Sequence, residues 1–243
     1  MKEVLRIRDL KQSYNGQLVL DIPLFAVDEQ EIVAIIGPSG AGKSTLLRLT
    51  NGLERPTQGK LFLRGDIVSP DESGLPVRRR MATVFQKPAV FNASVADNVA
   101  YGLLVRGARK GEICDRVDAA LDFVGLLSKK KQSARTLSGG EMQRVAMAMA
   151  IITQPDLFLL DEPTANLDPS NVAICEELIV SARAKFNMTI VLVTHNMFQA
   201  KRLATRTVLL LGGEIIEQGP TNDVFHHPKD SRTIEFVQGE MIY

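Results

Sequence analysis

A glycine-rich segment near residue 40 constrains this chain more than any other feature of its sequence. An apolar run, Ile32–Ile36, precedes the segment and is typical of a buried parallel strand. Apolar residues at helical spacing follow it, beginning at Leu46. The segment itself reads Gly37, Pro38, Ser39, Gly40, Ala41, Gly42, Lys43, Ser44 and Thr45. A strand, a turn of this composition and a helix, in this order, predict a phosphate-binding loop.

The residue types in this loop fit the phosphates of a nucleotide. Gly37, Gly40 and Gly42 leave backbone N–H groups free to surround phosphate oxygens. The helix that follows directs its positive end at the same oxygens. Lys43 supplies a mobile positive charge for the β- and γ-phosphates, and the Ser44 hydroxyl is a ligand for Mg²⁺.

Two carboxylates follow a second buried strand, at residues 157–160. In a parallel sheet the carboxyl ends of the strands meet at one edge, so we expect both carboxylates beside the phosphate loop. Asp161 is predicted to hold Mg²⁺, directly or through a water molecule. Glu162 lies one residue further out and is predicted to orient or deprotonate a water molecule at the γ-phosphate.

Composition narrows the classes of protein to which the chain can belong. Its 243 residues are 45% hydrophobic and 23% charged, which fits a globular protein with a substantial core. The net charge of +1 predicts no nucleic-acid partner. Two cysteines fit a reducing compartment. No signal peptide opens the sequence and no apolar run approaches the ~20 residues of a membrane helix, so we expect a cytoplasmic chain.

Strand patterns occupy both ends of the sequence. Residues 4–33 alternate in short pieces, which, with residues 61–63, predict an antiparallel patch. Helices are expected to begin near Pro169, with Asp168 as N-cap, and near Asn196. Further strands are predicted at residues 80–86, 157–160, 189–194 and 207–211. Strands that alternate with helices predict a mainly parallel α/β sheet.

The middle of the sequence has helical patterns instead. Ser94 has the spacing of an N-terminal capping residue, a second helix is predicted to end at Gly125, and Pro155 ends a third. We therefore expect one domain over residues 1–243. Residues 1–87 and 156–243 would form the nucleotide-binding α/β core with its antiparallel part, and residues 88–155 an inserted helical subdomain.

The third helix begins at a segment that permits two interpretations, Ser138, Gly139, Gly140 and Glu141. As a structural element, it is a capping box in which the Ser138 and Glu141 side chains satisfy backbone N–H groups. As a functional element, it is a helix N-terminus where two glycines expose N–H groups to a phosphate. The residues alone leave both interpretations open.

The phosphate loop, Leu137-Ser138-Gly139-Gly140-Glu141 and Leu159-Leu160-Asp161-Glu162-Pro163, in this order, resemble the nucleotide-binding subunit of ABC (ATP-binding cassette) proteins. The resemblance covers the whole chain, and the Ser-Gly-Gly element is specific to that family. It implies a P-loop NTPase (RecA-like) fold and an ATPase that uses ATP and Mg²⁺. Glu141 stands where many members have Gln, and Ala165 where many have Ser; neither variant removes a group assigned to phosphate chemistry.

The resemblance also assigns roles to further residues. Tyr14 matches the aromatic residue that stacks on adenine, although it can also be an ordinary core or surface tyrosine. Gln86 matches the glutamine that touches Mg²⁺ and the attacking water. Asp168 matches a loop that crosses to a second subunit, or it is only a helix N-cap. His195 matches the histidine that contacts the γ-phosphate.

The family likeness implies partners as well. It implies a homodimer in which ATP lies between the phosphate loop of one subunit and the Ser138–Glu141 segment of the other. A chain of this length resembles subunits of bacterial importers, which work with integral membrane permeases and, indirectly, with an extracytoplasmic solute-binding protein. Ala89, Val90 and Phe91 would then form an apolar dock for the permease, or else pack locally.

The cargo and the alternatives also follow from the resemblance. Residues 86–103 look most like those of oxyanion importers for tungstate, molybdate or phosphate, which would place the chain at the inner face of the cell membrane. The main alternative is a soluble ABC ATPase that drives assembly, such as iron–sulfur cluster biogenesis. Glu162 and His195 argue against a third class, a nucleotide switch that does not hydrolyse.

Overall fold

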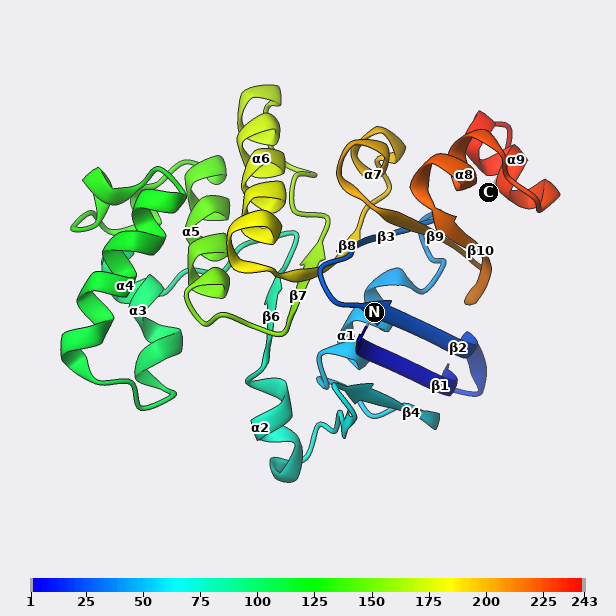
Figure 1. The fold of residues 1–243 in the computed structure, drawn as a ribbon, viewed down its shortest axis with the longest axis horizontal. Helices are drawn as coiled ribbons and strands as arrows, with labels where there is room; N and C mark the ends of the chain where they lie inside the picture. The colour runs from blue at the N-terminus through cyan, green and yellow to red at the C-terminus, as the bar shows by residue number, and fades with distance from the viewer. Residues whose placement is uncertain (1, 242–243) are drawn as a thin grey trace.

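A six-stranded sheet forms the centre of the computed structural model, which describes residues 2–241 (Figure 1). The strand order is β10-β9-β3-β8-β7-β6, and every neighbouring pair is parallel except β9 with β10. The strands are β3 (Ile32–Ile36), β6 (Met81–Val84), β7 (Leu157–Asp161), β8 (Thr189–Val193), β9 (Arg206–Leu211) and β10 (Glu214–Pro220). The predicted mainly parallel sheet is confirmed. β10 was not predicted because its residues are largely polar and half exposed.

Alternation along β3 separates the two faces of this sheet. Val33 and Ile35 are buried in one cluster with Leu46, which lies on helix α1 (Lys43–Thr50). Ala34 and Ile36 point to the opposite face, where helices of the second half of the chain cover them. β3 is thus buried on both faces, as its unbroken apolar run predicted.

A second, antiparallel sheet packs beside α1, and its presence confirms the predicted antiparallel patch. Its order is β2-β1-β4-β5, with β1 (Glu3–Tyr14), β2 (Gln17–Asp28), β4 (Gln58–Leu63) and β5 (Asp66–Ile67). The prediction of short pieces was wrong, because β1 and β2 run for 12 residues each. The alternation that marks a continuous strand breaks at Arg8 and Asp9, which are both exposed, and Asp9 has a left-handed φ of 49°.

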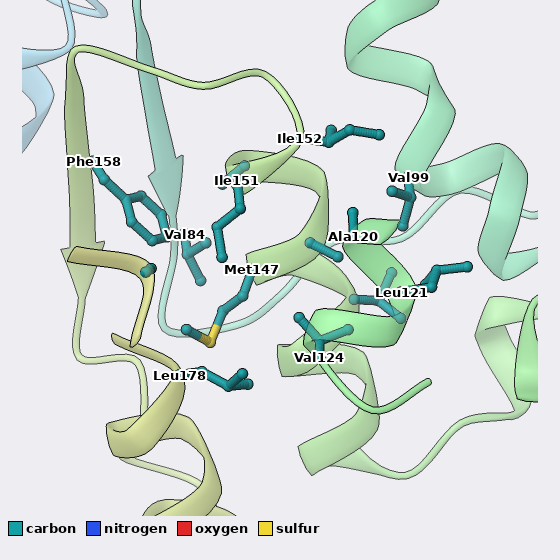
Figure 2. Close-up of a cluster of buried hydrophobic side chains, with 14 of the residues drawn as sticks. Val84, Val99, Ala120, Leu121, Val124, Met147, Ile151, Ile152, Phe158 and Leu178 are labelled. Carbon is teal, nitrogen blue, oxygen red and sulfur yellow. The ribbon is translucent and has the colours of Figure 1, made fainter. Parts of the chain in front are cut away.

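The helical insert packs against the six-stranded sheet. Its helices are α3 (Val95–Leu104), α4 (Lys110–Phe123) and α5 (Gly139–Ile151), and Ser94 caps α3 as predicted, accepting a hydrogen bond from the Asp97 N–H at 3.1 Å. Figure 2 shows α5 between the sheet and α4, with Met147 and Ile151 facing Phe158 of β7. This contact joins the last turns of α5 to the first residues of β7.

The remaining helices follow β7, β8 and β10, apart from the short α2 (Leu75–Arg78). They are α6 (Pro169–Phe186), α7 (Met197–Leu203), α8 (Thr221–His226) and α9 (Ser231–Gln238). Asp168 is the N-cap of α6 as predicted, and α7 begins directly after Asn196, where a helix start was predicted. α8 and α9 lie at the end of the molecule opposite α3 and α4 (Figure 1), where they bury Phe225 against the sheet. Within residues 2–241, no helix has the length and apolarity that a membrane crossing requires.

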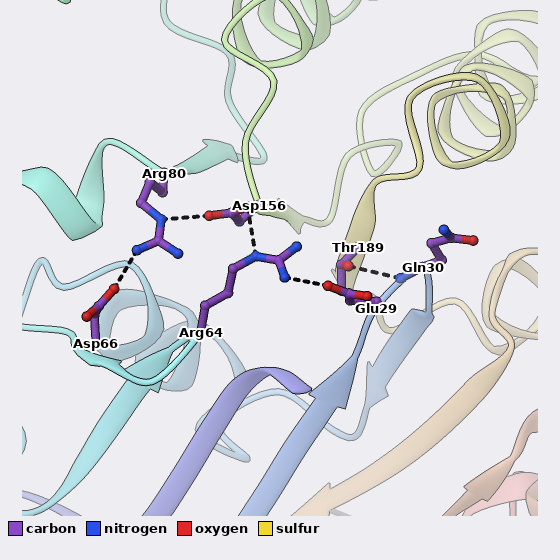
Figure 3. A network of polar contacts seen from close by, with 7 residues as sticks. All are labelled: Glu29, Gln30, Arg64, Asp66, Arg80, Asp156 and Thr189. Carbon is purple, nitrogen blue, oxygen red and sulfur yellow. Dashed lines mark hydrogen bonds and ion pairs between the residues drawn. The ribbon is translucent and has the colours of Figure 1, made fainter. Parts of the chain in front are cut away.

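Charged residues join the two sheets near the start of β7. Asp156 accepts hydrogen bonds from the Nε atoms of Arg64 at 2.9 Å and Arg80 at 2.7 Å (Figure 3). The outer ends of the two guanidinium groups pair with Glu29 and Asp66. Asp156 therefore ties the turn after β4 to the segment that enters β6.

We expect Asp156→Ala to lower the free energy of unfolding by about 1–2 kcal/mol, because it leaves two half-buried guanidinium groups short of an acceptor. Asp66→Ala is the control, since the Asp66 side chain is 59% exposed and pairs with Arg80 alone. Urea unfolding of both variants measures the difference. Equal losses of unfolding free energy in the two variants would show that Asp156 contributes no more than an ordinary surface ion pair does.

Candidate active site

The loop between β3 and α1 wraps around the Lys43 side chain. The Nζ atom donates hydrogen bonds to the carbonyl oxygens of Gly37 and Pro38, both at 2.7 Å. Lys43 is only 8% exposed. Burial lowers the pKa of its ammonium group, while the charges of Glu162 and Asp161 oppose that shift. A buried cation held by carbonyl oxygens is ready to exchange them for an anion.

The loop lies directly on the sheet. A Cβ atom at Gly37 would lie 2.1 Å from the carbonyl oxygen of Leu210 in β9, so glycine is required there. Gly42 is the N-cap of α1, with the left-handed φ of 97°. The predicted strand, loop and helix are therefore all present, and the N–H groups at the start of α1 border the loop.

Asp161 ends β7 close to this loop, as predicted. Its carboxyl group shares a hydrogen bond with the Ser44 side chain. Burial raises the pKa of Asp161, and the charge of Glu162 raises it further, whereas Ser44 and Lys43 act in the other direction. A hydroxyl and a carboxylate are the hard oxygen ligands that Mg²⁺ prefers, and Mg²⁺ needs only one or two carboxylates when phosphates supply the rest. The two side chains therefore fit Mg²⁺.

Glu162 has an unusual backbone. Its φ of 46° is left-handed, and its N–H donates to the carbonyl oxygen of Val193 at 2.9 Å. Its carboxylate pairs with Nδ1 of His195, whose side chain is 62% exposed while that of Glu162 is 17% exposed. A non-glycine residue in this region costs about 1–3 kcal/mol and persists where its surroundings impose it.

Several of these groups line a hollow of about 430 Å³. The residues that line it come from β1, β2, the phosphate loop, α1 and the end of β7: Tyr14, Val19, Ser39, Gly40, Gly42, Lys43, Ser44, Thr45 and Glu162. Tyr14 is 38% exposed, and its hydroxyl donates to Glu54, which pairs with Arg48. Eight of the predicted site residues therefore line one hollow, and one of them is the aromatic Tyr14.

The other predicted residues do not line this hollow. Gln86 is exposed and lies two residues beyond the end of β6. Ser138 and Glu141 form the capping box at the start of α5, so the structural interpretation of that segment is confirmed. Lys129 pairs with Glu141, and these contacts lower the pKa of Glu141 to about 2.

Asp168 is satisfied within its own helix. Its Oδ1 atom accepts from the N–H groups of Ser170 and Asn171, both at 3.0 Å, and Oδ2 accepts from the Asn171 side chain at 2.7 Å. The hydrogen bonds from the Ser170 and Asn171 side chains lower the pKa of Asp168 most, and those from the backbone N–H groups lower it further. Asp168 is therefore an N-cap, whatever else it contacts.

Sequence reasoning missed one residue in this region, Asn171. A Cβ atom at Gly140 would lie 2.2 Å from its Oδ1 atom, so the Asn171 amide lies against the start of α5. Asn171 thus links Gly140 to Asp168. The only signal in the sequence is its place three residues after an N-cap, and that position does not reveal a contact with a distant helix.

We expect Gly140→Ala to lower the free energy of unfolding by about 1–3 kcal/mol, because the new methyl group must displace an Asn171 side chain that Asp168 holds. Gly139→Ala is a matched control, since a Cβ there meets nothing within 4 Å. The double variant Gly140→Ala with Asn171→Ala should recover most of the loss. Thermal unfolding checks all three, and similar losses for Gly139→Ala and Gly140→Ala would contradict the steric explanation.

Known proteins resemble this chain along almost its whole length. A family model described as ABC transporter matches residues 20–165. The Phosphate import ATP-binding protein PstB 2 of Natronomonas pharaonis is 44% identical over 252 residues, covering 98% of this chain and 88% of that protein. A Probable anion import ATP-binding protein of Haloferax volcanii is 41% identical over 257 residues, covering 100% of this chain and 89% of that protein.

Solved structures agree with the fold. The structure of cbiO1 from Clostridium perfringens, described as part of the ABC transporter complex cbiONQ, has a TM-score of 0.87 at 30% identity and covers 97% of this chain and 95% of its own. A structure described as the ATP binding subunit of an ABC transporter has a TM-score of 0.83 at 28% identity, with 97% and 98% covered.

Proposed function

Because this chain belongs to the ABC transporter family, as an ATP-binding subunit that hydrolyses ATP, we propose that it powers a membrane importer of oxyanions. Lys43, Ser44 and Glu162 line one hollow, and Asp161 bonds to Ser44. This grouping carries the proposal, since these are the groups that nucleotide hydrolysis requires. Residues 1–87 and 156–243 act as the nucleotide-binding core, and residues 88–155 act as the helical subdomain.

Binding uses the loop and the ring above it. Lys43 exchanges the carbonyl oxygens of its own loop for phosphate oxygens, and the backbone from Gly37 to Thr45 surrounds them. Tyr14 stacks on the adenine at the mouth of the hollow. Ser44, Asp161 and Gln86 hold Mg²⁺, which neutralises charge on the phosphates when it is bound.

Hydrolysis uses the carboxylate next to the loop. Glu162 orients a water molecule and accepts its proton as the water oxygen bonds to the γ-phosphorus and the bond to the ADP oxygen breaks. His195 leaves its pairing with Glu162 to contact the γ-phosphate. Gln86, two residues beyond the end of β6, contacts the same water.

A second copy of the chain completes the site. Ser138, Gly139, Gly140 and Glu141 begin a helix whose N-terminus can bind phosphate, yet they do not line the hollow of their own chain. In the proposed homodimer they face the γ-phosphate held by the partner. Asp168 belongs to the loop that crosses from one subunit to the other. ATP then stabilises the dimer by mass action, and hydrolysis releases it.

The membrane partner docks on the helical insert. A second hollow, of about 320 Å³, opens between β6 and the insert, and Phe85, Ala89 and Tyr101 line it. The Phe91 and Tyr101 rings are 47% and 45% exposed with centroids 4.5 Å apart. Val90 packs partly against the core instead, so we assign docking to Ala89 and Phe91 alone.

The identity of the imported anion is the most specific part of the proposal. The resemblance of residues 86–103 to oxyanion importers, and the words phosphate import and anion import in the names of the two relatives, support an oxyanion. Tungstate and phosphate are the two candidates to compare, with an extracytoplasmic binding protein as the first carrier. The chain would then work at the cytoplasmic face of the membrane. The relatives do not favour an assembly ATPase.

Copurification from the native cell tests the proposal. The tagged chain is solubilised gently, and recovery of a multi-span membrane protein in a stoichiometric amount is the expected result. Titration of the associated binding protein with tungstate and with phosphate then identifies the cargo. Recovery of soluble scaffold proteins alone, with nothing from the membrane fraction, would overturn the transport function but leave the ATPase intact.

A further inference from the structure

A buried hydrogen-bond network joins the segments that carry Glu162 and His195. At its centre is Gln199 on α7, which is fully buried. The Nε2 atom of Gln199 donates to Oγ1 of Thr164 at 2.7 Å and to Oε1 of Glu176, on α6, at 3.2 Å. Because a carboxylate only accepts hydrogen bonds, the Glu176 contact fixes which end of the Gln199 amide is which.

One arm of this network leads to Glu162. Thr164 lies two residues beyond Glu162, in the turn where the N–H of Ala165 donates to the carbonyl oxygen of Glu162 at 3.2 Å. Glu162 itself has the left-handed φ of 46°. Such a backbone persists only when its surroundings hold it, and the Gln199–Thr164 hydrogen bond is one of those constraints.

The other arm leads to His195. Asn196, the next residue, caps α7 through its Oδ1 atom, which accepts from the N–H of Gln199 at 3.1 Å. The N–H of Asn196 in turn donates to the Thr194 hydroxyl at 3.0 Å. Gln199 therefore bonds through its backbone to the segment that carries His195, and through its side chain to the segment that carries Glu162.

Stability alone does not account for the amide of Gln199. Its Oε1 atom is buried and has no hydrogen-bond partner in the part of the chain that the structure describes. An unsatisfied buried acceptor is destabilising, and an apolar side chain of the same size would avoid it. The Glu176–Arg202 pair, with contacts of 2.7 and 2.8 Å, already joins α6 to α7.

We propose that Gln199 and Thr164 are positioning residues that hold the Glu162 carboxylate and the His195 imidazole in register. The inference rests on the proposed function only in that Glu162 activates the attacking water and His195 contacts the γ-phosphate. Without the Gln199–Thr164 link, the hydrogen bond from the Glu162 N–H to Val193 still joins the strand ends, but the turn beyond Glu162 can shift relative to the start of α7. Glu162 then loses its place against the attacking water while the phosphate loop, and with it nucleotide binding, is unaffected.

The first test needs no ATP. Thr164→Val and Gln199→Leu keep the side-chain size and remove the hydrogen bond. The ¹⁵N chemical shift of His195 Nδ1 in the nucleotide-free chain reports its pairing with Glu162, and the chain has only three histidines to assign. We expect both variants to move this shift toward that of a free imidazole. An unchanged shift in a folded Thr164→Val variant would overturn the inference whether or not the chain hydrolyses ATP.

The second test uses kinetics of the subunit with its membrane partner. We expect kcat to fall about tenfold in each variant with KM for ATP within about twofold, and the double variant to be no slower than either single variant. Arg202→Gln is the control, since it weakens the α6–α7 ion pair but leaves the Gln199–Thr164 bond. If kcat falls in proportion to the melting temperature in all variants, the Arg202→Gln control included, Gln199 and Thr164 have a purely structural role.

Discussion

Glu162→Gln should slow ATP hydrolysis by about 10²–10⁴-fold while leaving ATP binding intact. The amide keeps the size of the carboxylate but cannot accept the proton of the attacking water. Lys43, Ser44 and the loop backbone, the proposed phosphate-binding groups, do not change. The pairing with His195 loses its charge, so the imidazole becomes freer to turn toward the γ-phosphate.

The variant should also trap a dimer. If ATP lies between two copies of the chain, a site that binds but does not hydrolyse keeps them together. Light scattering at millimolar ATP is the measurement, with a monomer or weak dimer expected without nucleotide. Glu214→Gln is the matched control, since it makes the same chemical change in an exposed residue of β10, outside both the hollow and the Ser138–Glu141 segment. A monomeric Glu162→Gln variant at millimolar ATP would refute the sandwich.

The parts of the site that could be predicted from sequence depend on local signals. The phosphate loop lies between a buried strand and a helix start, so both its conformation and its position at the sheet edge were predictable. The same holds for Asp161 and Glu162 at the end of β7. The caps at Ser138 and Asp168 follow from side chains that bond within their own first turn.

The parts that could not be predicted depend on contacts between distant residues. The contact of Asn171 with Gly140, and that of Gln199 with Thr164, join segments whose separation in sequence hides them. β10 escaped prediction because it is half exposed and pairs on one side only, which leaves little apolar pattern. The hydrophobic periodicity of one chain likewise cannot predict how two copies associate. Only the family resemblance suggested that the Ser138 segment contacts a second copy.

The second large effect is expected at Lys43, where replacement by Met should weaken ATP binding by about 100-fold, or about 2.7 kcal/mol. The ammonium group makes charge-assisted hydrogen bonds with phosphate oxygens, and Met fills the same space without a donor. Titration with a fluorescent ATP analogue measures the loss. Ser44→Ala is the companion variant: it should bind ATP without Mg²⁺ as the native chain does, but lose the gain that Mg²⁺ brings.

The melting temperature of Lys43→Met shows whether the variant has lost ATP binding or has lost its fold. Burial lowers the pKa of the native ammonium group, which means that the folded chain without ATP holds this charge at an energetic cost. Removing the charge should therefore leave the melting temperature of the ATP-free chain unchanged or higher. Millimolar ATP should raise the melting temperature of the native chain by mass action and not that of the variant. If ATP stabilises both chains equally, Lys43 does not bind the phosphates, and its two carbonyl contacts only brace the loop.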